Sequence, residues 1–182
     1  MSVLILLQGL PGSGKSTFIQ ENNLEPFVIS LDTFRMLYDG IIAQDGQWTI
    51  RQDNPLIYKQ FEECLSYRLQ HKVPTIIDNT NVRSKDVSHY VELANKVGVP
   101  LFILPFDTPY SECLRRNESR PDYKVVPQIA MERIYQSLLS FTPPKNAKYI
   151  TQNECITILE DVKAQQMQLF MDKQMQEEIE MD

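Results

Sequence analysis

The apolar positions of this chain fall into short continuous runs, separated by longer segments in which apolar residues recur at helical spacing. Short runs of this kind predict buried strands, and the longer segments predict amphipathic helices. The runs that predict strands are residues 2–8, 27–31, 73–78, 99–106 and 147–150. Because strands alternate with helices and no hairpin signal is visible, the pattern predicts a three-layer α/β fold, in which helices cover both faces of a mostly parallel five-stranded sheet.

The longest predicted helix starts at Pro55, a residue that suits the first turn of a helix. Its helical spacing is carried by Leu56, Tyr58, Phe61, Leu65 and Leu69. We expect its aromatic residues in the core, and base stacking is the alternative. The preceding segment, residues 39–54, is polar, contains Trp48 and is rich in turn pairs such as Asp45-Gly46. This composition predicts a mobile connection over the site.

The first apolar run leads into a phosphate-binding loop. Gly9, four further residues and Gly14-Lys15-Ser16 complete the pattern G-x4-G-K-[ST]. The alternative is a glycine-rich turn without a ligand, but strand, loop and helix signals agree here. Lys15 would reach the β- and γ-phosphates and the Ser16 hydroxyl would bind magnesium, while backbone N–H groups converge on the phosphates. The sequence therefore predicts a triphosphate site formed by Gly12, Ser13, Gly14, Lys15, Ser16 and Thr17.

Two of the predicted strands lead into carboxylates. Asp32 follows the run at 27–31 and starts a predicted helix that also carries Arg35, and Asp78 ends the run at 73–78. Ligands of open α/β sheets bind at the carboxyl ends of the strands, so we expect both carboxylates at the site. Asp78 is typical of the second metal-binding element beside a phosphate loop, although it could instead cap the next turn.

A basic segment follows the fourth apolar run and predicts a lid at residues 111–126. Arg116 and Arg120 are four residues apart and would share one helical face, whereas Arg115 would point about a quarter-turn away. A solvated surface helix could carry the same charges. A lid that brings guanidinium groups over a transferring phosphoryl group is nevertheless the expected counterpart of a triphosphate site.

Composition and length indicate the class of protein and its expected location. The 182 residues, of which 42% are hydrophobic and 23% charged, suit one soluble domain. No apolar run approaches the roughly 20 residues of a membrane-spanning helix, and no signal peptide is recognisable, so we expect no membrane contact and a cytoplasmic location. The three cysteines and two histidines lack metal-ligand spacing, which argues against a zinc site.

The negative charge is concentrated near the end of the chain. Residues 161–182 carry six acidic residues and two lysines, which leaves −2 of the net −6 for the other 160 residues. An enzyme that handles one strand end needs only a local basic patch, so this charge does not exclude a nucleic-acid partner. We expect one domain at 1–160 and an acidic helical tail at 161–182, which could dock on the domain, fray in solvent or form a homo-oligomer contact.

Triphosphate sites serve hydrolases, switches and phosphotransferases, and the phosphate loop does not distinguish among them. Asp32 favours phosphotransfer, because a carboxylate can accept the proton of an attacking hydroxyl group. Arg35, one helical turn later, could anchor a phosphate of the acceptor. The residues therefore predict transfer to a molecule that carries both a hydroxyl group and an anion.

Several motifs, in their order and spacing, resemble the 5′-hydroxyl polynucleotide kinases, especially the kinase domain of phage-type end-healing enzymes. The resemblance spans about residues 3–140. It rests on the loop at 9–17, Asp32-x-x-Arg35, Asp78-Asn79-Thr80-Asn81, and Phe106-Asp-Thr-Pro-Tyr110 followed by Arg116-Asn-Glu-Ser-Arg120 and Val126-Pro127. The phosphatase signature Asp-x-Asp-x-Thr of the phage enzymes does not occur here, and the acidic tail has no counterpart.

The resemblance implies a P-loop kinase fold with a helical lid, and transfer of the γ-phosphate of ATP to the 5′-OH end of RNA or DNA with Mg2+, as in end repair. It implies Asp32 as general base, with Lys15, Arg116 and Arg120 on the transferring phosphate. Arg35, Asn79 and Thr80 would bind the acceptor, and Ser16 and Asp78 the metal, Asp78 directly or through water. The alternatives are a small-molecule or tRNA kinase of the same fold, and an ATP-gated binding module.

Overall fold

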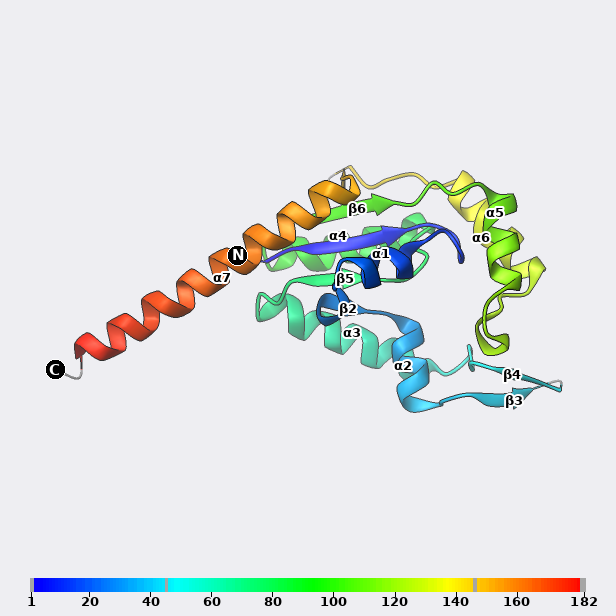
Figure 1. Cartoon of the computed structure of the whole chain (residues 1–182), viewed down its shortest axis with the longest axis horizontal. Helices are drawn as coiled ribbons and strands as arrows, with labels where there is room; N and C mark the ends of the chain where they lie inside the picture. Colours follow the sequence, from blue (N-terminus) through cyan, green and yellow to red (C-terminus); the bar gives the residue numbers. More distant parts are fainter. Residues whose placement is uncertain (1, 45, 146, 181–182) are drawn as a thin grey trace.

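Five strands form the central sheet in the order β2-β5-β1-β6-β7 (Figure 1). They are β1 (Leu4–Gln8), β2 (Val28–Ile29), β5 (Thr75–Ile77), β6 (Leu101–Pro105) and β7 (Lys148–Tyr149). All four pairings are parallel, which confirms the predicted α/β fold. This computed structural model describes residues 2–44, 46–145 and 147–180, so Asp45 and Asp182, used above, lie outside the described residues.

Helices cover both faces of this sheet. α3 (Pro55–Gln70) and α4 (Ser84–Lys96) pack on one face, and α1 (Lys15–Glu21) and the first turns of α7 (Gln152–Glu180) pack on the other. The central strand β1 serves both layers, because Leu4 and Leu6 join the first core and Ile5 and Leu7 join the second. A strand that is buried on both faces is apolar at every position, which is why its sequence shows no alternation.

The second strand is shorter than the run at 27–31 predicted. It contains only Val28–Ile29, because residues 25–27 form a 3-10 helix and Ser30 caps α2 (Leu31–Tyr38). The Ser30 hydroxyl accepts a hydrogen bond from the Thr33 amide at 3.0 Å. Asp32 lies in the first turn of α2, which confirms the predicted start of a helix at this residue, although Ser30 and Leu31 separate it from the end of the strand.

A β-hairpin occupies part of residues 39–54, so the expectation that no hairpin occurs was wrong. β3 (Ile42–Gln44) and β4 (Gln47–Thr49) are antiparallel, with Ala43 opposite Trp48. Gly46 has a φ of +76°, and the dipeptide Asp45-Gly46 is a typical sequence signal for a two-residue hairpin loop. β4 contacts the short helix η2 (Asp122–Lys124) of the lid.

The lid lies beyond the carboxyl ends of the strands (Figure 1). It consists mainly of α5 (Tyr110–Glu118) and η2, and α6 (Gln128–Leu139) follows it. Leu10 of the phosphate loop, Cys113 of α5 and Met131 of α6 form a small buried cluster. The loop and the lid are therefore packed together through a core of their own.

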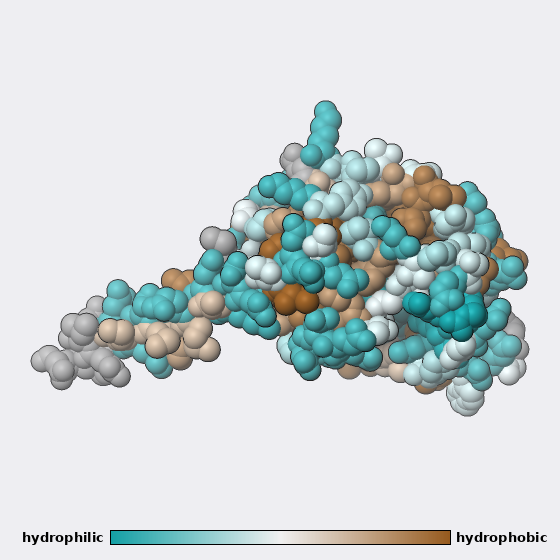
Figure 2. Space-filling view, turned by 45° about the horizontal axis from the view of Figure 1, so that its top comes forward, coloured by the Kyte–Doolittle hydropathy of each residue, from teal (hydrophilic) through white to brown (hydrophobic). Residues whose placement is uncertain are grey.

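The C-terminal helix α7 begins at Gln152, earlier than the start near residue 160 that the sequence suggested. Cys155, Leu159 and Val162 are buried against the sheet, and the rest of the helix extends from the body, away from the carboxyl ends of the strands (Figures 1 and 2). Its exposed large apolar residues are Met167, Leu169, Phe170, Met171 and Met175. Within the described ranges, no helix combines the length and apolarity that crossing a membrane requires.

Candidate functional site

Lys15 lies at the start of α1, beneath the phosphate loop. Its ammonium group donates hydrogen bonds to the backbone oxygens of Gly9 and Leu10, each at 2.9 Å. Only 8% of the residue is exposed. Burial lowers the pKa of Lys15 to about 8, although the Asp78 carboxylate acts in the opposite direction. A phosphate chain in the loop would offer this ammonium group charged acceptors, which form stronger hydrogen bonds than carbonyl oxygens.

The phosphate loop approaches the lid so closely that a side chain would not fit. Gly12 has a φ of +81°, and a Cβ atom there would lie 2.8 Å from the Cys113 carbonyl oxygen. Arg116 donates from Nη1 to the Gly12 carbonyl oxygen at 3.4 Å. Thr108 donates from its hydroxyl group to the Ser13 carbonyl oxygen at 2.9 Å. Glycine is therefore required at position 12 by both its conformation and its neighbours.

Ser16 and Thr17, the remaining loop residues predicted to bind the nucleotide, are exposed. Asp78 follows β5 and lies close enough to Lys15 and Asp32 for their charges to act on it. Burial raises the pKa of the Asp78 carboxyl group, and the Lys15 charge opposes that rise. A hydroxyl and a carboxylate oxygen beside a phosphate loop are the hard donors that Mg2+ prefers, and phosphates and waters normally complete its shell. The residues present therefore fit Mg2+.

No group of three or more histidine, cysteine, aspartate or glutamate side chains that could hold a metal occurs among the residues that the structure describes.

Asp32 and Arg35 face each other on α2. Arg35 donates from Nη1 to Asp32 Oδ1 at 2.7 Å, and its second terminal nitrogen lies 3.4 Å from the Tyr58 hydroxyl of α3. The Arg35 side chain is 9% exposed and that of Asp32 is 63% exposed. The carboxylate is thus open to solvent, while the guanidinium group that holds it is enclosed.

Arg120 lies outside α5, so the prediction that it shares a helical face with Arg116 was wrong. The helix ends at Glu118, and the amides of Ser119 and Arg120 close its last turn before Pro121. The guanidinium group of Arg120 nevertheless lies close enough to Asp32 and Asp78 for their charges to act on it. Burial lowers the pKa of its guanidinium group, and the carboxylates of Asp32 and Asp78 oppose that effect.

The turn after β5 joins the elements of the site. The Asn79 side-chain oxygen accepts from the Leu31 amide at 3.0 Å, and the Thr80 carbonyl oxygen accepts from the Gly9 amide at 3.0 Å. Asn81 has a φ of +49°, and its side chain donates to backbone oxygens in β1 and β5. Asn79 and Thr80 thus hold α2 and the loop in place, and their binding to an acceptor stays a prediction.

Two residues that organise the lid were not singled out from the sequence. The Asn117 side chain both donates to and accepts from the backbone of Val126, at 2.8 and 3.0 Å, and so closes the turn that carries Arg120. Glu112 accepts from Arg115 and Arg116, which lowers its pKa to about 2. The spacing of Glu112 and Arg116, four residues apart on a helix, was the available signal.

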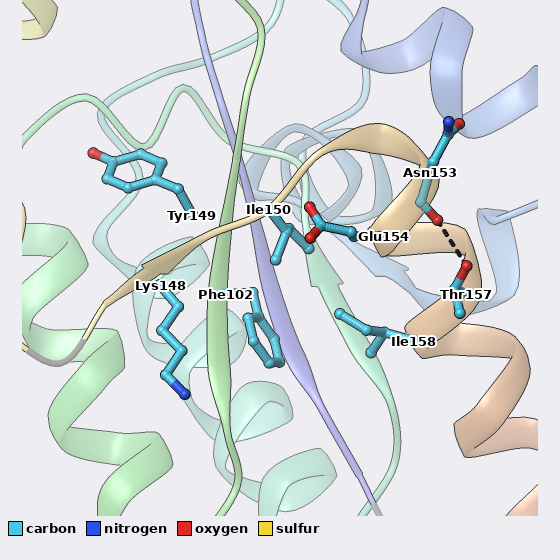
Figure 3. A pocket seen from close by; sticks show the side chains of 8 residues that line it. All are labelled: Phe102, Lys148, Tyr149, Ile150, Asn153, Glu154, Thr157 and Ile158. Atoms are coloured by element: carbon cyan, nitrogen blue, oxygen red, sulfur yellow. Dashed lines mark hydrogen bonds between the residues drawn. The ribbon is translucent and has the colours of Figure 1, made fainter.

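A surface pocket of about 470 Å³ lies at the edge of the sheet, between β6, β7 and the start of α7 (Figure 3). Its walls include Phe102, Ile150 and Ile158, and Lys148 and Glu154 are among its polar residues. None of its lining residues belongs to the phosphate loop, α2 or the lid, so the pocket is separate from the site described above.

Comparison with known proteins agrees with this architecture. A family model described as an AAA domain (AAA_33) matches residues 4–144. NEDD4-binding protein 2 of Homo sapiens is 32% identical over 103 residues, which are 52% of this chain and 5% of that protein. L-seryl-tRNA(Sec) kinase of Methanococcus maripaludis is 23% identical over 141 residues, which are 74% of this chain and 51% of that protein.

Among solved structures, a chain of the Pnkp1/Rnl/Hen1 RNA repair complex is similar to this one. The TM-score is 0.62 with 22% identity, and the match covers 76% of this chain and 44% of that chain. The matches therefore cover about half or less of the length of these similar proteins. The likeness supports the fold, which is of the P-loop kinase type.

Proposed function

We propose that this chain, which belongs to the AAA domain family AAA_33, transfers the γ-phosphate of ATP to the 5′-hydroxyl end of RNA or DNA. The observation that carries this proposal is the exposed Asp32 carboxylate, held at 2.7 Å by the enclosed Arg35 and close to Asp78. A carboxylate beside a fixed cation suits an acceptor with a hydroxyl group next to a phosphate.

In this proposal the site has two halves. The donor half consists of residues 9–17 with the lid, and the acceptor half consists of Asp32, Arg35 and their surroundings on α2 and α3. The acceptor oxygen forms a bond to the γ-phosphorus, the bond to the β,γ-bridging oxygen breaks, and ADP leaves. Asp32 accepts the hydroxyl proton, while Lys15, Arg116 and Arg120 neutralise charge on the transferring group.

A bound Mg2+ would supply further charge neutralisation at the phosphates. Ser16 and Asp78 would hold it, on the donor set described above. Arg35 would bind the phosphate nearest to the acceptor hydroxyl, and this contact would loosen its hold on Asp32 when the acceptor arrives. We propose that Asn79 and Thr80 border the acceptor, as the motif resemblance implies.

A second candidate is a tRNA or small-molecule kinase. It is favoured by the similarity to L-seryl-tRNA(Sec) kinase, which covers 74% of this chain. The two candidates differ in the acceptor, so a transfer screen with γ-labelled ATP distinguishes them. The screen compares 5′-OH oligonucleotides of RNA and DNA with nucleosides, sugars and tRNA. Label on oligonucleotide ends supports the first proposal, and label only on tRNA or a small molecule contradicts it.

The exposed apolar residues of α7 from Met167 onward favour a third possibility, an ATP-gated binding or assembly module. Such a module would form ATP-dependent complexes without acceptor-dependent release of ADP.

We propose the exposed apolar surface of α7 as a homo-oligomer contact. Sedimentation of the full chain and of a chain that ends at residue 163 tests it: an unchanged mass would count against the contact.

A further inference from the structure

Tyr58 in the first turn of α3 is not a core residue, although its spacing suggested one. Tyr58 is 46% exposed, whereas Phe61 on the same helix is 1% exposed. A large aromatic side chain that stays half-exposed while its neighbours pack inward is available to bind a partner ring. Because Tyr58 lies beside Arg35, its exposed ring belongs to the acceptor half of the site.

Tyr58 touches Arg35 in two ways. Its hydroxyl oxygen lies 3.4 Å from Arg35 Nη2, and its ring centroid lies 5.9 Å from Arg35 Cζ. Because the same guanidinium group binds Asp32, one continuous row of side chains connects the exposed carboxylate to the exposed ring. An acceptor whose hydroxyl group reaches Asp32 and whose phosphate reaches Arg35 would have its next apolar part close to Tyr58.

The two helices that carry this row are firmly joined. Phe34 of α2 and Phe61 of α3 form an edge-to-face ring contact with centroids 5.9 Å apart. The Tyr38 hydroxyl donates to Gln60 at 2.9 Å across the same pair of helices. A ring that is held on a rigid support loses little conformational entropy when it binds, as a stacking residue requires.

We propose that the Tyr58 ring stacks on the first nucleobase of the acceptor strand, next to the phosphate that Arg35 binds. This inference rests on the proposed function and narrows it, because it requires an acceptor with a base near its 5′ end. Stacking uses the π-face that all bases share. The Tyr58 ring, as a stacking platform, therefore accepts any base and rejects an abasic residue.

The test measures transfer from ATP to a 5′-OH hexanucleotide and to the same strand with an abasic first residue. Tyr58→Ala should raise KM for the intact strand about tenfold to a hundredfold, the loss expected for one base–aromatic stack, with kcat and KM for ATP unchanged. Tyr58→Phe, which keeps the ring, should retain most of the acceptor affinity that Tyr58→Ala loses. The abasic strand should be equally poor for wild type and Tyr58→Ala, because neither pair can stack.

Tyr67 provides a matched control. It lies on the same helix, is 60% exposed and stacks on His71, and among the residues that the structure describes no hydrogen bond or ring contact joins its side chain to α2 or the phosphate loop. Tyr67→Ala should leave acceptor KM unchanged. An unchanged KM for ATP in Tyr58→Ala shows that the variant is folded.

The outcomes separate this inference from the function on which it rests. A wild-type acceptor KM for Tyr58→Ala overturns the platform while transfer by the wild type stands. If Tyr58→Phe is as impaired as Tyr58→Ala, the hydroxyl group positions Arg35 and the stacking proposal is wrong. If the wild-type protein labels no oligonucleotide, the proposed function and the platform both fail.

Discussion

The donor and acceptor halves of the site are built in different ways. In the donor half, Lys15 is almost enclosed, and the backbone of the phosphate loop is bound by the Thr108 and Arg116 side chains and by the Thr80 carbonyl oxygen. The acceptor half combines side chains of α2 and α3, and its Asp32 carboxylate is 63% exposed. The donor half is fixed before any ligand binds, whereas the acceptor half is open.

The two halves also differ in the chemistry that each would recognise. A phosphate chain is the same in every reaction that uses ATP, so the loop that binds it recurs among proteins with different acceptors. Acceptor chemistry depends on a few exposed side chains outside the loop. The choice between a polynucleotide and another acceptor therefore depends on α2 and α3.

The largest effect is expected from Asp32→Ala. Removing the proton acceptor should reduce kcat by up to about 10⁴-fold, the upper end of the contribution of general-base catalysis. ATP affinity should hardly change, because the loop does not use this residue. Asp86→Ala is the control, since Asp86 also pairs with an arginine three residues away at 2.7 Å. Full kinase activity in Asp32→Ala would remove this residue from its role.

Arg120→Ala should reduce kcat by about 10³-fold, the lower end of what an arginine on a transferring phosphoryl group contributes. Arg115→Ala should change it less than twofold, because Arg115 is exposed and bound to Glu112. Comparable losses in both variants would mean that the lid acts through its overall charge. Steady-state kinetics with saturating acceptor separates these results.

Arg35→Ala should act on the acceptor half alone. Loss of a charged hydrogen bond to phosphate should raise acceptor KM about tenfold to a hundredfold, with KM for ATP unchanged. An unchanged acceptor KM would contradict the assignment of Arg35. An equal rise in KM for ATP would show that the donor and acceptor halves are not independent.

The smallest effect concerns the pH dependence of ATP binding. With a pKa of about 8, Lys15 is charged at pH 7 and mostly neutral at pH 9. Bound phosphates favour the charged form, so ATP binding above pH 8 must take up a proton. Calorimetry should find ATP about tenfold weaker at pH 9 than at pH 7. Lys15→Arg, which stays charged, should abolish this change, and a flat wild-type profile would contradict the low pKa.

The donor half could be predicted from the sequence because its information is local. Gly9, Gly14 and Lys15 are close in the chain, and the strand and helix around them are strongly patterned. Asp32, Arg35 and Asp78 were also identified, since residues after parallel strands meet at one edge of the sheet. The α/β fold followed from the alternation of strand and helix patterns.

Other features depend on contacts that a local pattern does not contain. Tyr58 fits the helical spacing of α3 as well as Phe61 does, but Phe61 is the ring that packs against Phe34 of α2 and Tyr90 of α4. Arg120 leaves the helical face of Arg116 because Asn117 binds Val126 and closes a turn instead. The hairpin was different: the Asp45-Gly46 pair was a readable signal, and its neighbouring strands were simply too short to form a clear pattern.

The contact between β4 of the hairpin and η2 of the lid connects the acceptor half of the site with the donor half. η2 follows the turn that carries Arg120, and the hairpin follows α2, which carries Asp32. Movement of one of these elements should therefore displace the other. Since binding free energies are reciprocal, we expect ATP and the acceptor each to change the affinity of the other, and kinetic analysis to show synergistic rather than independent substrate binding.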